Sequence, residues 1–231
     1  MWAIVPIKTF ERAKQRLADV LSPAERRALM LAMARDVLTS LSKSRQLSGV
    51  LIVSRAPEAE ALAQSFATER FAESPNADLA TALTQATEHL INHFGAQGVF
   101  VIPADVPNIS ADEVDQLIID HQHITLLPDD NKIGTNGMIC APPLAMPYIF
   151  DGQSFKPHVD AAYQAGITPR VVPASRFALD VDTPNDLHEV MHRQPHSQTA
   201  IFLSRSGIAE RLTSRGQAAN DATPGDELGS S

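Results

Sequence analysis

The chain has 231 residues and a formal net charge of −8, which argues against a general nucleic-acid-binding protein. Its length suits one sizeable α/β domain, and its 44% hydrophobic residues fill a core best when most elements pack on one sheet. The single cysteine, Cys140, excludes an internal disulfide and a thiolate metal cluster and fits a reducing cytoplasm. The sequence leaves no room for a signal peptide before the first strand, and its apolar runs are too short to span a membrane. We therefore expect a cytoplasmic protein with neither membrane nor nucleic-acid partners.

A cluster of basic residues follows the first predicted strand, residues 3–6. The cluster consists of Lys8, Arg12, Lys14 and Arg16. Directly after an amino-terminal strand, these side chains would line a phosphate pocket at the carboxyl edge of the sheet. The loop lacks the glycines of a P-loop or a dinucleotide fingerprint, and a solvent-exposed basic face explains the cluster equally well.

A strong helix start follows at Ser22, because a serine N-cap, Pro23 at the first helical position and Glu25 together form a capping box. The spacing of apolar residues carries this helix to about Leu41. Further strands are predicted at 50–54, 71–72, 99–102, 124–127, 138–141 and 170–173, and further helices at 57–66, 77–94, 111–121, 155–165 and from Thr183 onward.

The strand 99–102 ends in a stretch that holds Asp105 between Pro103 and Pro107. Proline restricts the backbone on both sides, so we expect Asp105 on a stiff turn at the carboxyl edge of the sheet, where ligands bind in α/β proteins. One rigid carboxylate suits Mg²⁺, which is held by few carboxylates plus substrate phosphates. Asp105 could instead cap the next helix, but Ser110 is better placed for that role.

Two further stretches predict contacts with a small anionic substrate. Thr135 and Asn136 lie between two glycines, which would let an anion approach backbone N–H groups, although a plain hairpin turn fits equally well. Ser154 lies at the start of the helix 155–165, where free N–H groups favour anions. His158 faces the same first turn, but a lone histidine is more often structural than catalytic.

The stretch before the helix at Thr183 carries Asp180 and Asp182, which point to the same side if the backbone is extended. Two such charges need a cation or a basic neighbour to stay ionised together. Asp182 and Asp105 are the natural pair for one shared metal ion.

The character of the chain changes after about residue 193. We predict one main domain over 1–193 and a short extension over 194–215, with one helix or a strand and a helix within 201–212. Residues 216–231 are small and polar, which predicts a disordered tail.

Six blocks in this order resemble a known family, the guanylyltransferases that activate a small phosphorylated carboxylic acid in the biosynthesis of the deazaflavin coenzyme F-420. The resemblance covers roughly residues 2–191. The blocks are A-I-V-P-I-K with A-K-Q-R-L in 3–17, L-S-P-A-E-R at 21–26, P-A-D-V-P at 103–107, G-T-N at 134–136, S-F-K-P-H at 154–158 and A-L-D-V-D-T-P-N-D-L at 178–187.

The resemblance implies a Rossmann-like α/β/α nucleotidyltransferase fold of the GT-A-like type, with a mixed, mostly parallel sheet, GTP as co-substrate and Mg²⁺ as cofactor. Its acid substrates are 2-phospho-L-lactate, phosphoenolpyruvate or 3-phospho-D-glycerate. By the same resemblance, Asp105 and Asp182 would hold the metal, with Asp180 as alternative or support. The nucleotide site would comprise Pro6, Lys8, Lys14, Arg16 and Asp78, the catalytic residues would be Lys14, Arg16 and Asp105, and the acid site would comprise Thr135, Asn136, Asp151, Ser154 and His158.

The sequence departs from the family pattern at three places. Asp151 stands where the family tends to have glycine, Asp78-Leu79-Ala80 replaces Gly-Leu-Asn, and Met138 and Cys140 replace plain aliphatic residues. An acid pocket of altered polarity would suit an extra hydroxyl, so 3-phospho-D-glycerate is a candidate substrate.

Two alternative functions stay open. The first is another nucleotidyltransferase of the same fold, acting on molybdopterin or a sugar phosphate, although such enzymes usually carry a glycine-rich loop after the first strand. The second is a non-catalytic nucleotide sensor, which would bind GTP without releasing pyrophosphate. A homodimer, and hand-over of the product to a downstream transferase, are further expectations.

Overall fold

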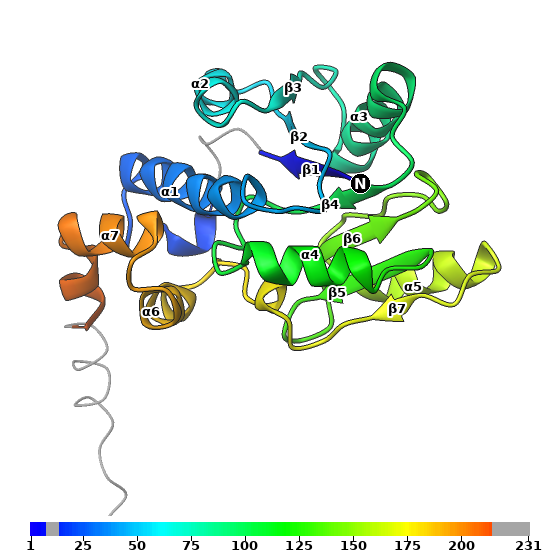
Figure 1. Ribbon diagram of the computed structural model, residues 1–231. Helices are drawn as coiled ribbons and strands as arrows, with labels where there is room; N and C mark the ends of the chain where they lie inside the picture. Colours follow the sequence, from blue (N-terminus) through cyan, green and yellow to red (C-terminus); the bar gives the residue numbers. More distant parts are fainter. Residues whose placement is uncertain (8–13, 214–231) are drawn as a thin grey trace, which may run out of the picture.

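One seven-stranded sheet forms the centre of the protein in the computed structural model, which describes residues 1–7 and 14–213 (Figure 1). The strand order is β3-β2-β1-β4-β6-β5-β7. The strands are β1 (Trp2–Pro6), β2 (Gly49–Val53), β3 (Glu69–Phe71), β4 (Val99–Val101), β5 (Ile124–Pro128), β6 (Thr135–Cys140) and β7 (Arg170–Val171).

Strand β6 is antiparallel to both of its neighbours, β4 and β5, whereas every other pair in the sheet is parallel. The predicted mixed, mostly parallel sheet is therefore confirmed. Because β1 and β4 are parallel neighbours, their carboxyl ends meet at one edge of the sheet.

Helices cover both faces of the sheet and give three layers (Figure 1). Side chains alternate along β1, so that Ala3 and Val5 join the larger apolar core while Ile4 joins the core on the opposite face. The larger core includes residues of α1 (Pro23–Leu41), α2 (Pro57–Phe66), α4 (Ala111–Ile119), α6 (Pro184–Arg193) and α7 (Gln198–Arg205), and the opposite core includes residues of α3 (Leu79–Phe94) and α5 (Phe155–Gln164). Within residues 1–7 and 14–213, none of the helices combines the length and apolar character needed to cross a membrane.

Local sequence signals place most boundaries correctly. Helix α1 starts with the predicted capping box, in which Ser22 and Glu25 exchange hydrogen bonds. Helix α3 starts two residues later than predicted, because Asp78 is its N-cap. The largest difference lies at Thr135 and Asn136, which belong to strand β6 rather than to a loop.

Tertiary packing explains the longer β6. Residues Thr135 and Gly137 pair with the end of β5, so the strand extends back to the loop Asp129–Gly134. A side chain at Gly137 would lie 2.6 Å from Leu127 Cδ1, because Leu127 and Phe177 pack directly against its backbone. The glycine therefore permits close packing within a strand, whereas the sequence suggested that it marks a turn.

The predicted extension contains α7 rather than a strand, and residues 208–213 are helical. Helix α7 packs beside α1, and Leu203 belongs to the larger apolar core (Figure 1). Its first turn is held by the Asp36 carboxylate, which accepts hydrogen bonds from the Gln198 and Thr199 backbone N–H groups at 2.7 and 2.8 Å. The domain boundary near residue 193 stays a prediction, and the predicted tail lies outside the described residues.

Candidate active site

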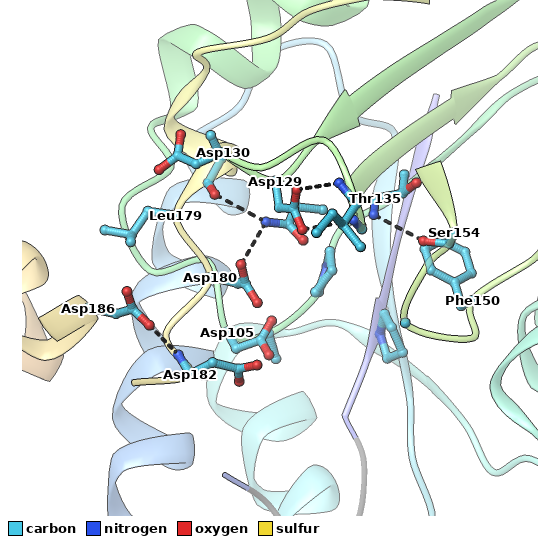
Figure 2. Close-up of a pocket in the computed structure, with 18 of the residues that line it drawn as sticks. Asp105, Asp129, Asp130, Thr135, Phe150, Ser154, Leu179, Asp180, Asp182 and Asp186 are labelled. Carbon is cyan, nitrogen blue, oxygen red and sulfur yellow. Dashed lines mark hydrogen bonds between the residues drawn. The ribbon is translucent and has the colours of Figure 1, made fainter. Parts of the chain in front are cut away.

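A cavity of about 770 Å³ opens at the carboxyl edge of β1 and β4. Figure 2 shows Asp105, Asp180 and Asp182 together on one side of it, and Thr135, Ser154 and Phe150 on the other. The loop after β4 supplies Asp105, whose backbone carbonyl accepts a hydrogen bond from the Val181 N–H at 3.0 Å. This bond holds the segment with Asp180 and Asp182 against the end of β4, although the two segments are far apart in the sequence.

A single ammonium group bridges the two carboxylates that the sequence assigned to a metal. Lys14 Nζ lies 2.6 Å from Asp105 Oδ2 and 2.7 Å from Asp182 Oδ1. Burial alone would lower the pKa of Lys14, but the attraction of both carboxylates outweighs it, so this pKa is raised above its ordinary value. Lys14 is thus a fixed positive charge in the wall of the cavity.

The backbone at Lys14 is in the left-handed region, with φ of 54°, which costs a non-glycine residue about 1 kcal/mol. The two ion pairs offset that cost and fix the side chain at the acidic side of the cavity. Arg16 also lines the cavity, but it is mostly exposed and reaches Asp182 Oδ2 only at 3.7 Å. Pro6 lines the cavity as well.

Polar contacts also orient Asp180 and Asp182. The Asn136 amide donates to Asp180 Oδ1 at 3.1 Å, and burial together with the nearby Asp105 charge raises the pKa of the Asp180 carboxyl. The Asp182 backbone N–H donates at 2.9 Å to Asp186 Oδ2, the same oxygen that accepts from the Thr183 N–H in the capping box that begins α6. The sequence predicted a helix from Thr183 onward but not that its Asp186 also fixes the backbone of Asp182.

Two buried hydroxyl groups lie across the cavity from the carboxylates. Thr135 and Ser154 are only 5% and 3% exposed, and both line the cavity. Ser154 lies at the N-terminus of α5, as predicted, and its Oγ accepts a hydrogen bond from the Thr135 backbone N–H at 3.0 Å. A small anion in the cavity would therefore meet hydroxyl groups on one side and cations on the other.

Several predicted site residues lie elsewhere. Asp78, Asp151 and His158 are not among the described residues that line the cavity. Asp78 caps α3 by accepting from the Thr81 N–H, and the exposed Asp151 accepts from the Gln153 N–H at 3.1 Å. The nucleotide and substrate roles of these residues stay predictions, and Lys8 lies outside the described residues.

Other side chains of the cavity wall were not assigned to the site from the sequence, although the polar loop at 128–134 was expected to be able to close over a ligand. The loop after β5 contributes Asp129 and Ile133, and the connection before α5 contributes Phe150. Asp129 accepts from the Ile133 and Gly134 backbone N–H groups, both at 2.8 Å, so its carboxylate shapes the loop. The sequence showed a polar loop here but gave no indication of which side chains face the cavity.

The donor set suits one Mg²⁺ ion. Two carboxylate oxygens, one each from Asp105 and Asp182, converge on the Lys14 ammonium within 2.7 Å, so they are close enough together for one cation to contact both. Across the described ranges 1–7 and 14–213, no three acidic, histidine or cysteine side chains come together as a metal site. A metal here would thus depend on substrate phosphates for further ligands, and Asp180 as support stays a prediction.

Buried His158 predicts an effect of pH on stability. Burial lowers its pKa from 6.5 to about 4, against a smaller opposing effect of Asp151, so the unfolded chain takes up a proton first as pH falls below 6.5. Stability due to the neutral ring is complete above that pH and is lost progressively towards pH 4. When the pH falls from about 7.5 to about 5.5, we expect the free energy of unfolding to decrease by about 1 kcal/mol because of His158.

Denaturant unfolding of the wild type and His158→Gln at both pH values measures this loss. The variant should lose about 1 kcal/mol less than the wild type over the same interval. The pKa of His121 is also lowered to about 4, but this residue is present in both proteins and cancels in the comparison. Equal losses in the two proteins would contradict the prediction.

Solved structures of nucleotidyltransferases share this fold. A nucleotidyl transferase from Methanothermobacter thermautotroptrophicus matches with a TM-score of 0.65 and 17% identity, covering 84% of this chain and 97% of the other. A cytidylyltransferase from Leptospira borgpetersenii matches with a TM-score of 0.59 and 12% identity over 96% of this chain and 98% of the other. The expected nucleotidyltransferase fold is therefore confirmed.

Sequence comparisons are more specific. A phosphoenolpyruvate guanylyltransferase of Sphaerobacter thermophilus is 35% identical over 84% of this chain and 93% of its own length. A 2-phospho-L-lactate guanylyltransferase of Methanobrevibacter ruminantium is 30% identical over 90% of this chain and 92% of its own length. The family model described as guanylyl transferase CofC like matches residues 1–219, and so this chain belongs to the CofC-like guanylyl transferase family.

Proposed function

We propose that this protein transfers GMP from GTP to a small phosphorylated carboxylic acid and releases pyrophosphate, as a step in the biosynthesis of the deazaflavin coenzyme F-420. One observation carries the proposal. Lys14 joins Asp105 and Asp182 on one side of a cavity of about 770 Å³, and the Thr135 and Ser154 hydroxyls lie on its other side. Membership of the guanylyl transferase family supports the same activity.

In the reaction, a phosphate oxygen of the acid attacks the α-phosphorus of GTP. A new P–O–P bond forms between the acid and GMP, the bond from the α-phosphorus to the bridging oxygen breaks, and pyrophosphate leaves with that electron pair. The attacking oxygen is already ionised, so no general base is required. Catalysis then depends on alignment of the two phosphates and on neutralisation of their charge.

The chain's own residues divide these tasks. Lys14 and Arg16 supply positive charge for the triphosphate, and the Thr135 and Ser154 hydroxyls hold the acid in the opposite part of the cavity. Asp105 and Asp182 would hold Mg²⁺, which when bound neutralises phosphate charge and polarises the phosphorus centre. Lys8 is proposed to add to the positive charge.

The names of relatives narrow the acid substrate to a few candidates. Their names give phosphoenolpyruvate and 2-phospho-L-lactate as substrates, and 3-phospho-D-glycerate is the third candidate. Met138 and Cys140 are buried in the apolar core and do not line the cavity, so neither changes the polarity of its described wall. The extra carboxylate of Asp151 is exposed outside that wall. These departures therefore give little support for 3-phospho-D-glycerate over the other two acids.

Pyrophosphate release from GTP and Mg²⁺, measured in parallel with each of the three acids, tests the proposal. A coupled pyrophosphatase should be present, because guanylylation of this kind can be unfavourable at equilibrium. We expect pyrophosphate release with at least one acid and none with GTP alone. The product should have the mass of the acid plus GMP minus one water molecule. No release with any acid would contradict the proposal.

The same assay separates the alternatives. Turnover with molybdopterin or a sugar phosphate would indicate another nucleotidyltransferase of this fold. Binding of GTP without pyrophosphate release would indicate a nucleotide sensor. A cytoplasmic location, a homodimer and hand-over of the product to a downstream transferase belong to the same proposal.

A further inference from the structure

His158 lies one layer behind the cavity wall and is fully buried, with 0% exposure. Both of its ring nitrogens have a partner. The Ile149 backbone N–H lies 2.9 Å from Nε2, and the Thr135 hydroxyl oxygen lies 2.9 Å from Nδ1. The Phe150 ring packs edge-on against the imidazole, with ring centroids 4.9 Å apart.

The direction of these two hydrogen bonds follows from the Ile149 contact. A backbone N–H can only donate, so Nε2 must accept and carries no proton. The neutral ring therefore carries its proton on Nδ1 and donates it to Thr135 Oγ1. Burial lowers the pKa of His158 to about 4, which keeps the ring neutral near physiological pH.

The consequence reaches the cavity wall. Thr135 Oγ1 accepts from His158, and Ser154 Oγ accepts from the Thr135 backbone N–H. Among the residues that the structure describes, neither hydroxyl has an acceptor for its own hydrogen. Both hydroxyl groups are nearly buried, and both line the cavity, so their hydrogens are available to an anionic oxygen there.

We propose that His158 is a positioning residue, which donates from Nδ1 to Thr135 and thereby fixes the Thr135 hydroxyl as a hydrogen-bond donor to an anionic oxygen of the acid substrate. This inference rests on the proposed function. It gives His158 no contact with substrate and no role in proton transfer, since both ring nitrogens are occupied. It also explains why the buried histidine beside an anion site is neutral. In a charged ring the Nε2 proton would face the Ile149 N–H, so two donors would oppose each other.

Two substitutions separate the two hydrogen bonds of the ring. In His158→Gln, the amide reaches the Nε2 position and can still accept from Ile149, but the donor to Thr135 is lost. In His158→Asn, the amide reaches the Nδ1 position and can still donate to Thr135, but the acceptor for Ile149 is lost. Steady-state kinetics should use whichever acid the wild type turns over, among phosphoenolpyruvate, 2-phospho-L-lactate and 3-phospho-D-glycerate.

We expect His158→Gln to raise KM for the acid by about 10-fold or more, the effect of one hydrogen bond to a charged group, while KM for GTP changes less than about twofold. His158→Asn should keep KM for the acid within about threefold of the wild type. Tyr148→Phe is the matched control. It removes another buried hydrogen bond of this region, that of Tyr148 with Thr87, but leaves both hydrogen bonds of His158 in place. It should leave both KM values unchanged.

A double-mutant cycle with Thr135→Val tests whether the effect passes through the hydroxyl. We expect His158→Gln to add little to the KM of Thr135→Val, because the group that it orients is already absent. Full additivity would overturn the inference, as would equal effects of the Gln and Asn variants, or equal rises in both KM values. Inactivity of the wild type with all three acids would instead overturn the proposed function.

Wild-type protein provides a measurement that does not depend on folding of the variants. Long-range ¹H–¹⁵N NMR of the histidine rings should show His158 with its proton on Nδ1 and a bare Nε2. A proton on Nε2 would overturn the inference, whatever the kinetics show. Thr135→Ser, which keeps the hydroxyl, should retain a low KM for the acid where Thr135→Val does not.

Discussion

Replacing Asp105 with asparagine should lower kcat by about 100-fold to about 1,000-fold, the size of effect seen when a group that stabilises transition-state charge is removed. Asp105 supplies one of the two carboxylate oxygens that converge at the cavity, and an amide binds Mg²⁺ less strongly. The measurement is single-turnover and steady-state pyrophosphate release at saturating GTP and acid.

The fold should survive this change. The contact that ties Asp105 to the Val181 N–H uses a backbone carbonyl, and Lys14 keeps its ion pair with Asp182. Asp112→Asn, an exposed substitution in the first turn of α4, is the matched control and should leave kcat unchanged. Activity of Asp105→Asn within about threefold of the wild type, at an unchanged melting temperature, would remove Asp105 from the proposed metal site.

Replacing Lys14 with methionine should reduce kcat/KM for GTP by about 100-fold or more, because it removes the buried positive charge that we propose faces the triphosphate. It should also destabilise the protein, since Asp105 and Asp182 then face each other without a cation. Breaking a fully buried ion pair costs about 3–5 kcal/mol, but these side chains keep 27% and 40% exposure, so we expect a smaller loss.

Thermal unfolding with and without Mg²⁺ gives a second measure of the same variant. A divalent cation should raise the melting temperature of Lys14→Met more than that of the wild type, because the two carboxylates no longer share an ammonium. Lys156→Met is the matched control, since it removes an exposed ion pair with Asp160 and should change neither quantity. If Mg²⁺ raised the melting temperatures of Lys14→Met and wild type equally, this would contradict the idea that the Lys14 ammonium and Mg²⁺ use the same two carboxylates.

Local signals in the sequence were sufficient for the elements and for one end of the site. The cap at Ser22 and the cap at Thr183 are made by residues within a few positions of each other, so the helices that follow them start where predicted. The strand before Asp105 and the two flanking prolines likewise place that carboxylate at the carboxyl edge of the sheet. Family motifs then identified the class of enzyme, which the comparisons confirm.

The tertiary structure alone decided which of these side chains meet and which partners they take. Lys14 bridges Asp105 and Asp182 from positions that are 91 and 168 residues away in the sequence, and no local pattern encodes that choice. Strand β6 extends to Thr135 because β5 pairs with it, and only that pairing brings Thr135 against His158. The sequence by itself determined the residue types and the edge of the sheet at which they gather. Long-range packing determined which groups face the cavity and which lie behind it, because burial and hydrogen-bond partners depend on segments that come together only in the folded chain.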